Sequence, residues 1–217
     1  MCNVAFYYLL RSAEYTHTGK KQQTTPLCLC DITFWCNTRA LPAWADASTI
    51  STATAATLNL RSQKNGEKDT PVYLTASHTP HCPVRALTRI AAYILQHIKD
   101  RNTPVYTYWN PKGDTRKVHA TDITQAIRTA ATDMTLDQYG IAIAQVSSHS
   151  LRSAGAMALH LAGVPAHTIR LMGRWKSDAF LSYLHTQLSC FTEGLSSLMS
   201  TSHTFTNVAR VPSSKGG

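Results

Sequence analysis

The chain has 217 residues, which at about 150 residues per domain accommodates one sizeable domain and a tail. Its 21 Lys and Arg side chains outnumber its 12 Asp and Glu side chains, so the net charge is +9 although only 15% of residues are charged. This imbalance disfavours an acidic, cation-binding protein and favours a polyanionic partner, either nucleic acid or an anionic membrane surface. A basic soluble protein without such a partner is the alternative that the charge leaves open.

No apolar run reaches the about 18 residues that a membrane span needs. The N-terminal segment does not resemble a signal peptide, because it lacks a basic start and its apolar stretch is interrupted by Arg11 and Glu14. We therefore expect reduced thiols in an intracellular protein. His78, His81 and Cys82 are spaced like a metal corner, but no fourth ligand is obvious, so no metal or other cofactor is expected.

The sequence of the first part of the chain predicts a small sheet that is preceded by one helix and followed by another. Asn65-Gly66 is typical of a hairpin turn, because both residues tolerate a positive φ. The apolar spacing after Pro83 is typical of a helix with one buried face. The elements expected in chain order are a helix over 3–15, a polar turn over 16–26, a strand pair over 27–35, a loop over 37–55, a hairpin of strands 58–61 and 72–74, a helix over 83–100 and an extended stretch over 104–109.

The second part of the chain is expected to be helical. Thr121 is the predicted N-cap of a helix that continues through Ala131, and Gly163 is expected to end a later helix. Further helices are predicted over 147–162, 165–173 and 177–198. The predicted fold class is mainly α with a small antiparallel β-sheet, an α+β domain over residues 1–200, with a disordered tail over 201–217.

Candidate chemistry begins at His149 and Arg152, which share one face of a predicted helix. Such a pair is suited to binding a phosphate, because the Arg guanidinium can donate two hydrogen bonds at once and His can also transfer a proton. Taken alone, the pair is more typical of a solvated face.

The residues that follow sharpen this interpretation. Gly173-Arg174-Trp175 and then Tyr183 come after His149-Ser-Leu-Arg152, and this order resembles the C-terminal signature of tyrosine recombinases, the phage-integrase family. Arg11, followed three residues later by Glu14, is similar to the first conserved box of that family. Lys64 lies on the predicted hairpin where the family keeps a catalytic lysine. The resemblance covers most of the chain. The sequence of residues 173–183 is most similar to recombinases of eukaryotic mobile elements, both DIRS-type and crypton-like.

The resemblance implies a mechanism that cuts and rejoins double-stranded DNA without a metal. Tyr183 would attack a scissile phosphate and form a 3′-phosphotyrosyl link, and Arg11 and Arg152 would hold the non-bridging oxygens. Lys64 would protonate the leaving 5′-oxygen, and His149 would act as general acid and base. Trp175 replaces a histidine that many members carry, and its indole N–H can donate to phosphate but cannot relay a proton. Glu14 would orient the site rather than react.

Each of these residues also has a plainer interpretation. Tyr183 on its own would be an ordinary core aromatic residue, and Trp175 can serve by packing below the site. Arg170, Arg174 and Lys176 are predicted either to contact the DNA backbone or to be solvated.

The chain also departs from the family pattern. Trp175 and Tyr183 are eight residues apart where many members have nine, and only ten residues precede Arg11. We therefore expect a catalytic domain without the DNA-clamping domain that usually precedes it. The main hypothesis is an active recombinase that assembles as a tetramer on DNA and acts in the nucleus if the source is eukaryotic. The alternatives are a remnant that binds DNA without turnover and a basic helical protein whose motif order is accidental.

Overall fold

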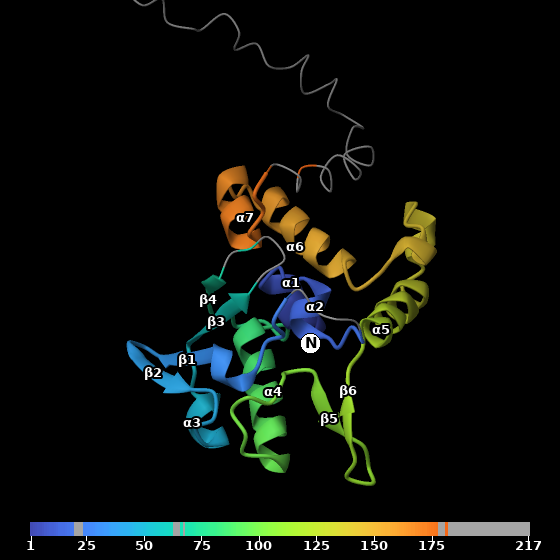
Figure 1. Ribbon diagram of the computed structural model, residues 1–217. Helices are drawn as coiled ribbons and strands as arrows, with labels where there is room; N and C mark the ends of the chain where they lie inside the picture. Colours follow the sequence, from blue (N-terminus) through green and yellow to red (C-terminus); the bar gives the residue numbers. More distant parts are fainter. Residues whose placement is uncertain (20–23, 63–65, 67, 178–180, 182–217) are drawn as a thin grey trace, which may run out of the picture.

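The computed structural model describes residues 1–19, 24–62, 66, 68–177 and 181. Within these residues the fold is a mixed α+β arrangement built around a small antiparallel sheet (Figure 1). The helices are α1 (Cys2–Tyr7), α2 (Ser12–Tyr15), α3 (Ala47–Ser51), α4 (Pro83–His97), α5 (Ala120–Asp133), α6 (Ser150–Leu161) and α7 (Ala166–Gly173), with short 3-10 turns η1 (Leu29–Asp31), η2 (Leu136–Tyr139) and η3 (Ile143–Gln145). The strands are β1 (Ile32–Cys36), β2 (Arg39–Pro42), β3 (Ala55–Ser62), β4 (Lys68–Thr75), β5 (Thr107–Trp109) and β6 (Thr115–Lys117).

The main sheet has the strand order β2-β1-β3-β4, with every neighbouring pair antiparallel. The predicted hairpin is confirmed, because β3 and β4 pair along their length with Leu58 opposite Val72. Of its turn, Gly66 is described and has φ +83°, whereas Lys64 and Asn65 lie outside the described residues.

The prediction of a loop over 37–55 was wrong. Residues 39–42 form β2, which pairs with β1, and residues 47–51 form α3. The carboxylate of Asp46 caps α3 by accepting the backbone N–H of Thr49 at 2.9 Å. The expected strand pair over 27–35 is also corrected: β1 starts only at Ile32, and Leu29 lies in η1, although Leu29 is buried as a strand residue would be.

The N-terminal segment is not the single helix predicted over 3–15. It breaks after α1 because Leu9 has a left-handed backbone with φ +49°, and α2 starts only at Ser12. Leu9 is fully buried, and the break turns its carbonyl oxygen toward α6 and the residues after α7, where it accepts hydrogen bonds from Arg152 and Arg174. The break therefore positions a hydrogen-bond acceptor for the arginine cluster described in the next subsection.

The hydrophobic core lies between the sheet and α4, with α1 packed beside them (Figure 1). Phe34 and Leu58 come from the sheet, and Leu87, Ala91 and Ile94 come from one face of α4; all five are fully buried. The helix starts at Pro83 as predicted but ends at His97 rather than at residue 100, because Ile98 is already extended. No helix in the described part of the chain is long and apolar enough to cross a membrane.

The region between α4 and α6 holds more structure than predicted. The extended stretch at Thr107–Trp109 pairs with β6, so that β5 and β6 form a second, two-stranded sheet. The predicted N-cap at Thr121 was wrong, because α5 starts at Ala120 and its N-cap is His119, whose backbone N–H donates to the Asp122 carboxylate at 2.8 Å. The cap is satisfied by the acid at the third helical position rather than by a threonine hydroxyl.

Helices α6 and α7 match the predicted helical segments, except that α6 starts at Ser150 rather than at residue 147. Gly163 ends the first segment with φ +77°, as its sequence position indicated. Apart from residues 177 and 181, the helix predicted over 177–198 lies outside the described residues, and so does the tail predicted over 201–217.

Helix α6 crosses α1 at Gly155, where no side chain has room. An ideal Cβ at this position would lie 2.3 Å from the carbonyl oxygen of Phe6 and 2.6 Å from the Leu9 side chain. We expect Gly155→Ala to lower the free energy of unfolding by about 1–3 kcal/mol, because the backbone of α1 has to move aside. Urea unfolding measures the loss, with Leu161→Ala in the exposed last turn of α6 as the control. Equal stability of Gly155→Ala and the unsubstituted chain would contradict this close crossing.

Candidate active site

A buried carboxylate joins two arginines from opposite ends of the described chain. Glu14 in α2 is 1% exposed and lies 2.9 Å from Nη2 of Arg174 and 3.2 Å from Nη1 of Arg11. The Glu14 carboxylate also accepts the backbone N–H of Arg11 at 2.8 Å, which closes the first turn of α2. Nη2 of Arg11 in turn donates to the carbonyl oxygen of Arg174 at 3.2 Å. Glu14 thus contacts both guanidinium groups and holds them in place.

Arg152 lies beside this cluster and is itself 2% exposed. Its Nη1 and Nη2 atoms donate to the carbonyl oxygens of Leu9 and Gly173, respectively. Its guanidinium carbon lies 4.2 Å from the centre of the Trp175 ring, which is a cation–π contact. Arg152 is therefore fixed between the break after α1 and the end of α7.

Trp175 can lie against Arg152 because Gly173 has no side chain. A Cβ at Gly173 would lie 1.5 Å from the Trp175 ring, so any other residue there would push the indole away. The next residue, Arg174, has a left-handed backbone with φ +56°, which turns the chain back so that the ring of Trp175 can cover Gly173. Local packing therefore requires the glycine at position 173, whether or not Trp175 also takes part in the chemistry.

His149 is the N-cap of α6 and lies among these cations. Burial first, and then the charges of Arg152 and Arg11, lower the pKa of the His149 imidazole below its ordinary value. The ring is therefore mostly neutral at neutral pH and can accept a proton. The structure thus brings Arg11 close to the segment that carries His149 and Arg152, more than 130 residues further along the chain.

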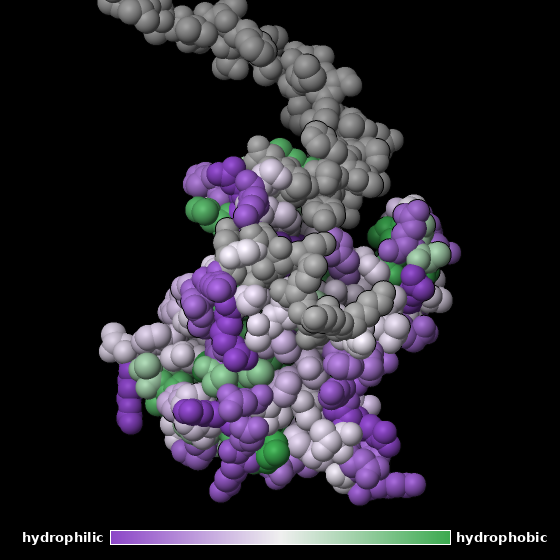
Figure 2. All heavy atoms as spheres, in the orientation of Figure 1, coloured by the Kyte–Doolittle hydropathy of each residue, from purple (hydrophilic) through white to green (hydrophobic). Residues whose placement is uncertain are grey.

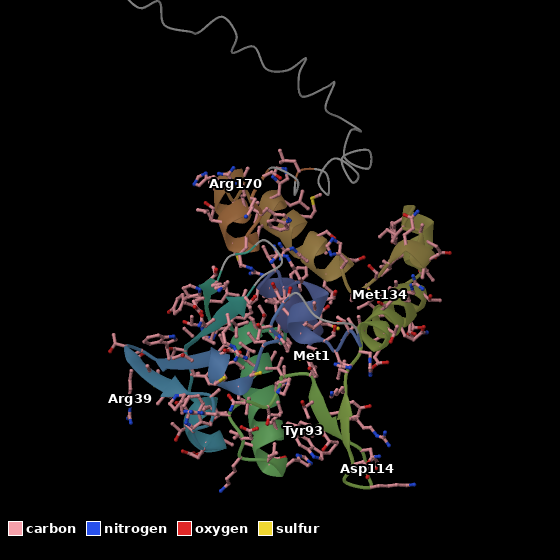
Figure 3. The ribbon with its side chains drawn as sticks, viewed as in Figure 1. Met1, Arg39, Tyr93, Asp114, Met134 and Arg170 are labelled. Atoms are coloured by element: carbon pink, nitrogen blue, oxygen red, sulfur yellow. The ribbon has the colours of Figure 1, made fainter. Side chains whose placement is uncertain are left out.

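The other predicted site residues differ in what the structure says of them. Lys64 and Tyr183 lie outside the described residues, so their predicted roles stay predictions. Lys176 is exposed and Arg170 is half-buried in the last turn of α7, and Figure 3 places Arg170 at the end of the molecule far from the β5–β6 hairpin. Both positions leave the predicted contact with a DNA backbone geometrically open.

Arg174 corrects the prediction of an exposed, DNA-contacting side chain. Its side chain is 1% exposed, and its guanidinium donates to the carbonyl oxygens of Tyr8 and Leu9 as well as to the Glu14 carboxylate. A buried carboxylate needs a charged or hydrogen-bonding partner, and Arg174 supplies it here. The apolar neighbours of Glu14 in the sequence could have indicated that it needs such a partner, but nothing in the sequence shows which arginine provides it.

His78, His81 and Cys82, which the sequence spaces like metal ligands, do not form a set of metal ligands in the structure. No group of three or more His, Cys, Asp or Glu side chains close enough to hold a metal ion occurs among the described residues. Comparison of the chain with protein-family models gives no match, and comparison with curated proteins gives none either.

Proposed function

We propose that the chain is a DNA strand-transfer enzyme of the tyrosine-recombinase type, with its active site at the cluster around Arg11, His149 and Arg152. The observation that carries the proposal is the meeting of these three residues, which the order of the sequence motifs predicts to share one site. A chance arrangement of the motifs would scatter them over different faces of the molecule.

The charge of the cluster supports a phosphate ligand. Its described members include three guanidinium groups, those of Arg11, Arg152 and Arg174, and one carboxylate, that of Glu14. Arg11 is the most accessible of them, with its side chain 20% exposed. Fixed guanidinium groups can stabilise the charge that develops on a phosphate during its transfer, and they do so best where water is largely excluded.

In the proposed reaction the Tyr183 hydroxyl oxygen bonds to the scissile phosphorus, and the bond from phosphorus to the 5′-oxygen breaks. The hydroxyl proton passes to His149, whose lowered pKa leaves the ring neutral and able to accept one. Lys64 gives a proton to the leaving 5′-oxygen. The reverse steps on a second DNA end rejoin the strands, so no outside energy source is required.

A second candidate function is DNA binding without turnover, and one observation favours it. Both terminal nitrogens of Arg152 already donate to backbone carbonyl oxygens, and the residue is 2% exposed. An arginine held in this way stabilises the fold whether or not it also meets a phosphate. The enzyme and the binding module therefore differ in whether DNA becomes covalently attached.

A trapping assay separates the two functions. A pool of labelled duplexes of random sequence carries a sulfur in place of the bridging 5′-oxygen, so that cleavage releases a thiol that rejoins poorly. We expect a protein–DNA adduct on a denaturing gel, and we expect Tyr183→Phe to abolish it because the nucleophilic oxygen is gone. Tyr139→Phe is the matched control, since Tyr139 is 71% exposed in η2. Retained DNA binding with no adduct from the unsubstituted chain would instead support the binding module.

A further inference from the structure

A second cluster of basic side chains lies where β6 leads into α5. The rings of His17 and His119 meet edge to face with their centres 5.1 Å apart, and a parallel bridge joins the two residues. Lys117, at the end of β6, lies close enough for its charge to act on His17. His119 and Lys117 are exposed and His17 is half-buried, so the cluster faces solvent.

The cluster and the candidate site are joined through one residue. Ser148 precedes His149, and its backbone N–H donates to the Thr124 hydroxyl at 3.0 Å. The carbonyl oxygen of Ser148 accepts the Tyr15 hydroxyl at 3.2 Å. In the sequence, Thr124 follows His119 within the first turns of α5, and Tyr15 closely precedes His17. Ser148 thus contacts one residue from each of the two segments that carry the second cluster.

The two clusters are close to each other along the chain. The segment from Arg11 to His17 spans at most about 20 Å when fully extended. Helix α2 shortens this reach, because a helical residue advances only about 1.5 Å. Phosphates on one strand follow each other at about 3.4 Å of helix axis, so the distance from Arg11 to His17 corresponds to at most about six phosphate steps of a duplex. Figure 1 shows α2 beside the start of α5, and Figure 2 shows hydrophilic residues gathered over the β5–β6 hairpin below it.

The chemistry of the cluster suits an anion better than a cation. Two imidazoles alone would bind a metal ion weakly, and the Lys117 ammonium beside them repels one. A phosphate instead can accept hydrogen bonds from imidazole N–H groups and from the ammonium group. The groups that face the histidines are Lys117, the Tyr106 ring 5.8 Å from the His17 ring, and Asp122, whose carboxylate is engaged by the backbone N–H of His119.

We propose that His17, Lys117 and His119 form a second phosphate-binding position, which contacts the DNA backbone beside the cleavage site and takes up protons as DNA binds. This inference rests on the proposed DNA-binding function. Desolvation and the charges of Lys117 and His119 lower the pKa of His17, so the ring is mostly neutral in the free protein at neutral pH. A bound phosphate favours the charged ring, so the affinity for DNA should rise as pH falls.

The test measures the affinity for a short fluorescein-labelled duplex of mixed sequence by anisotropy, between about pH 5.5 and pH 8. We expect the double variant His17→Gln/His119→Gln to bind as the unsubstituted chain does at the alkaline end and about tenfold more weakly at the acid end. Lys117→Gln should lower the slope of log affinity against log salt by about one at every pH. The matched controls are His160→Gln, in the last turn of α6, and Lys99→Gln, beyond the end of α4. They should change neither the pH dependence of the affinity nor its slope against log salt.

The outcomes are distinguishable. If the chain binds duplex DNA but the double variant keeps the full pH dependence and Lys117→Gln keeps the full salt slope, the second position is overturned while the proposed function stands. If the unsubstituted chain does not bind duplex DNA at low salt, the proposed function fails and this inference fails with it. Lys117 is exposed at the end of β6, so its variant tests the position even if the double variant is unstable.

Discussion

Replacing Glu14 with alanine is expected to lower the free energy of unfolding by about 3–5 kcal/mol, the cost of removing one partner from a buried ion pair. The Arg174 side chain is 1% exposed and would be left facing Arg11 with the carboxylate between them gone. The backbone N–H of Arg11 would also lose its acceptor. Urea unfolding followed by circular dichroism measures the loss.

Two further substitutions make the Glu14 experiment specific. Glu14→Gln keeps the size and one acceptor oxygen but removes the charge, so its effect should fall between those of Glu14→Ala and the unsubstituted chain. Asp114→Ala removes an exposed ion pair, in which the side chains of Asp114 and Arg116 are more than half exposed, and should cost less than about 1 kcal/mol. A cost for Glu14→Ala no greater than that for Asp114→Ala would show that the buried pair contributes little.

Arg152→Lys is expected to slow formation of the covalent DNA adduct by about 10²–10³-fold, the usual effect of removing a donor that stabilises developing charge. A lysine carries the same charge but cannot span the carbonyl oxygens of Leu9 and Gly173 while lying flat on Trp175. The trapping assay measures the rate, and urea unfolding of the same variant measures how much of the loss comes from the fold.

Arg128→Lys is the control for that substitution. Arg128 in α5 also holds two backbone carbonyl oxygens, those of Ala144 and Val146, but it lies outside the Arg11–Arg152 cluster. Its replacement should therefore cost some stability and leave the adduct rate nearly unchanged. Equal rates for Arg152→Lys and Arg128→Lys would show that the Arg152 guanidinium stabilises the fold and does not stabilise the transferring phosphate.

The sequence predicts the parts of the fold in which pattern and turn chemistry agree. The β3–β4 hairpin combines alternating residues with an Asn-Gly turn, and α4 combines a proline at its first position with a single apolar face. The break at Leu9 could not be predicted, because a leucine in an apolar run carries no signal for a left-handed backbone. Strand β2 and helix α3 were missed because both are short and largely exposed.

The candidate site was also predictable from the sequence only in part. The proximity of Arg11, His149 and Arg152 was expected from the order of the motifs, because that order resembles the tyrosine-recombinase signature, in which the corresponding residues share one site. The burial of Arg174 was not, because its contact with Glu14 joins residues 160 positions apart and depends on the turn after α7. A basic residue is expected to be exposed unless a partner for its charge is known.

The contacts of Leu9 bear on how the molecule assembles as it is made. Its carbonyl oxygen accepts hydrogen bonds from donors 143 and 165 residues further along the chain, and Glu14 pairs with a donor 160 residues away. Contacts of such high sequence separation form slowly, since the entropy of closing the intervening chain has to be overcome first. A nascent chain synthesised only as far as α5 therefore contains its sheet and α4, while Leu9 and Glu14 lack their later partners. Leu9 and Glu14 are synthesised before the sheet, but they are among the last residues to reach their final surroundings.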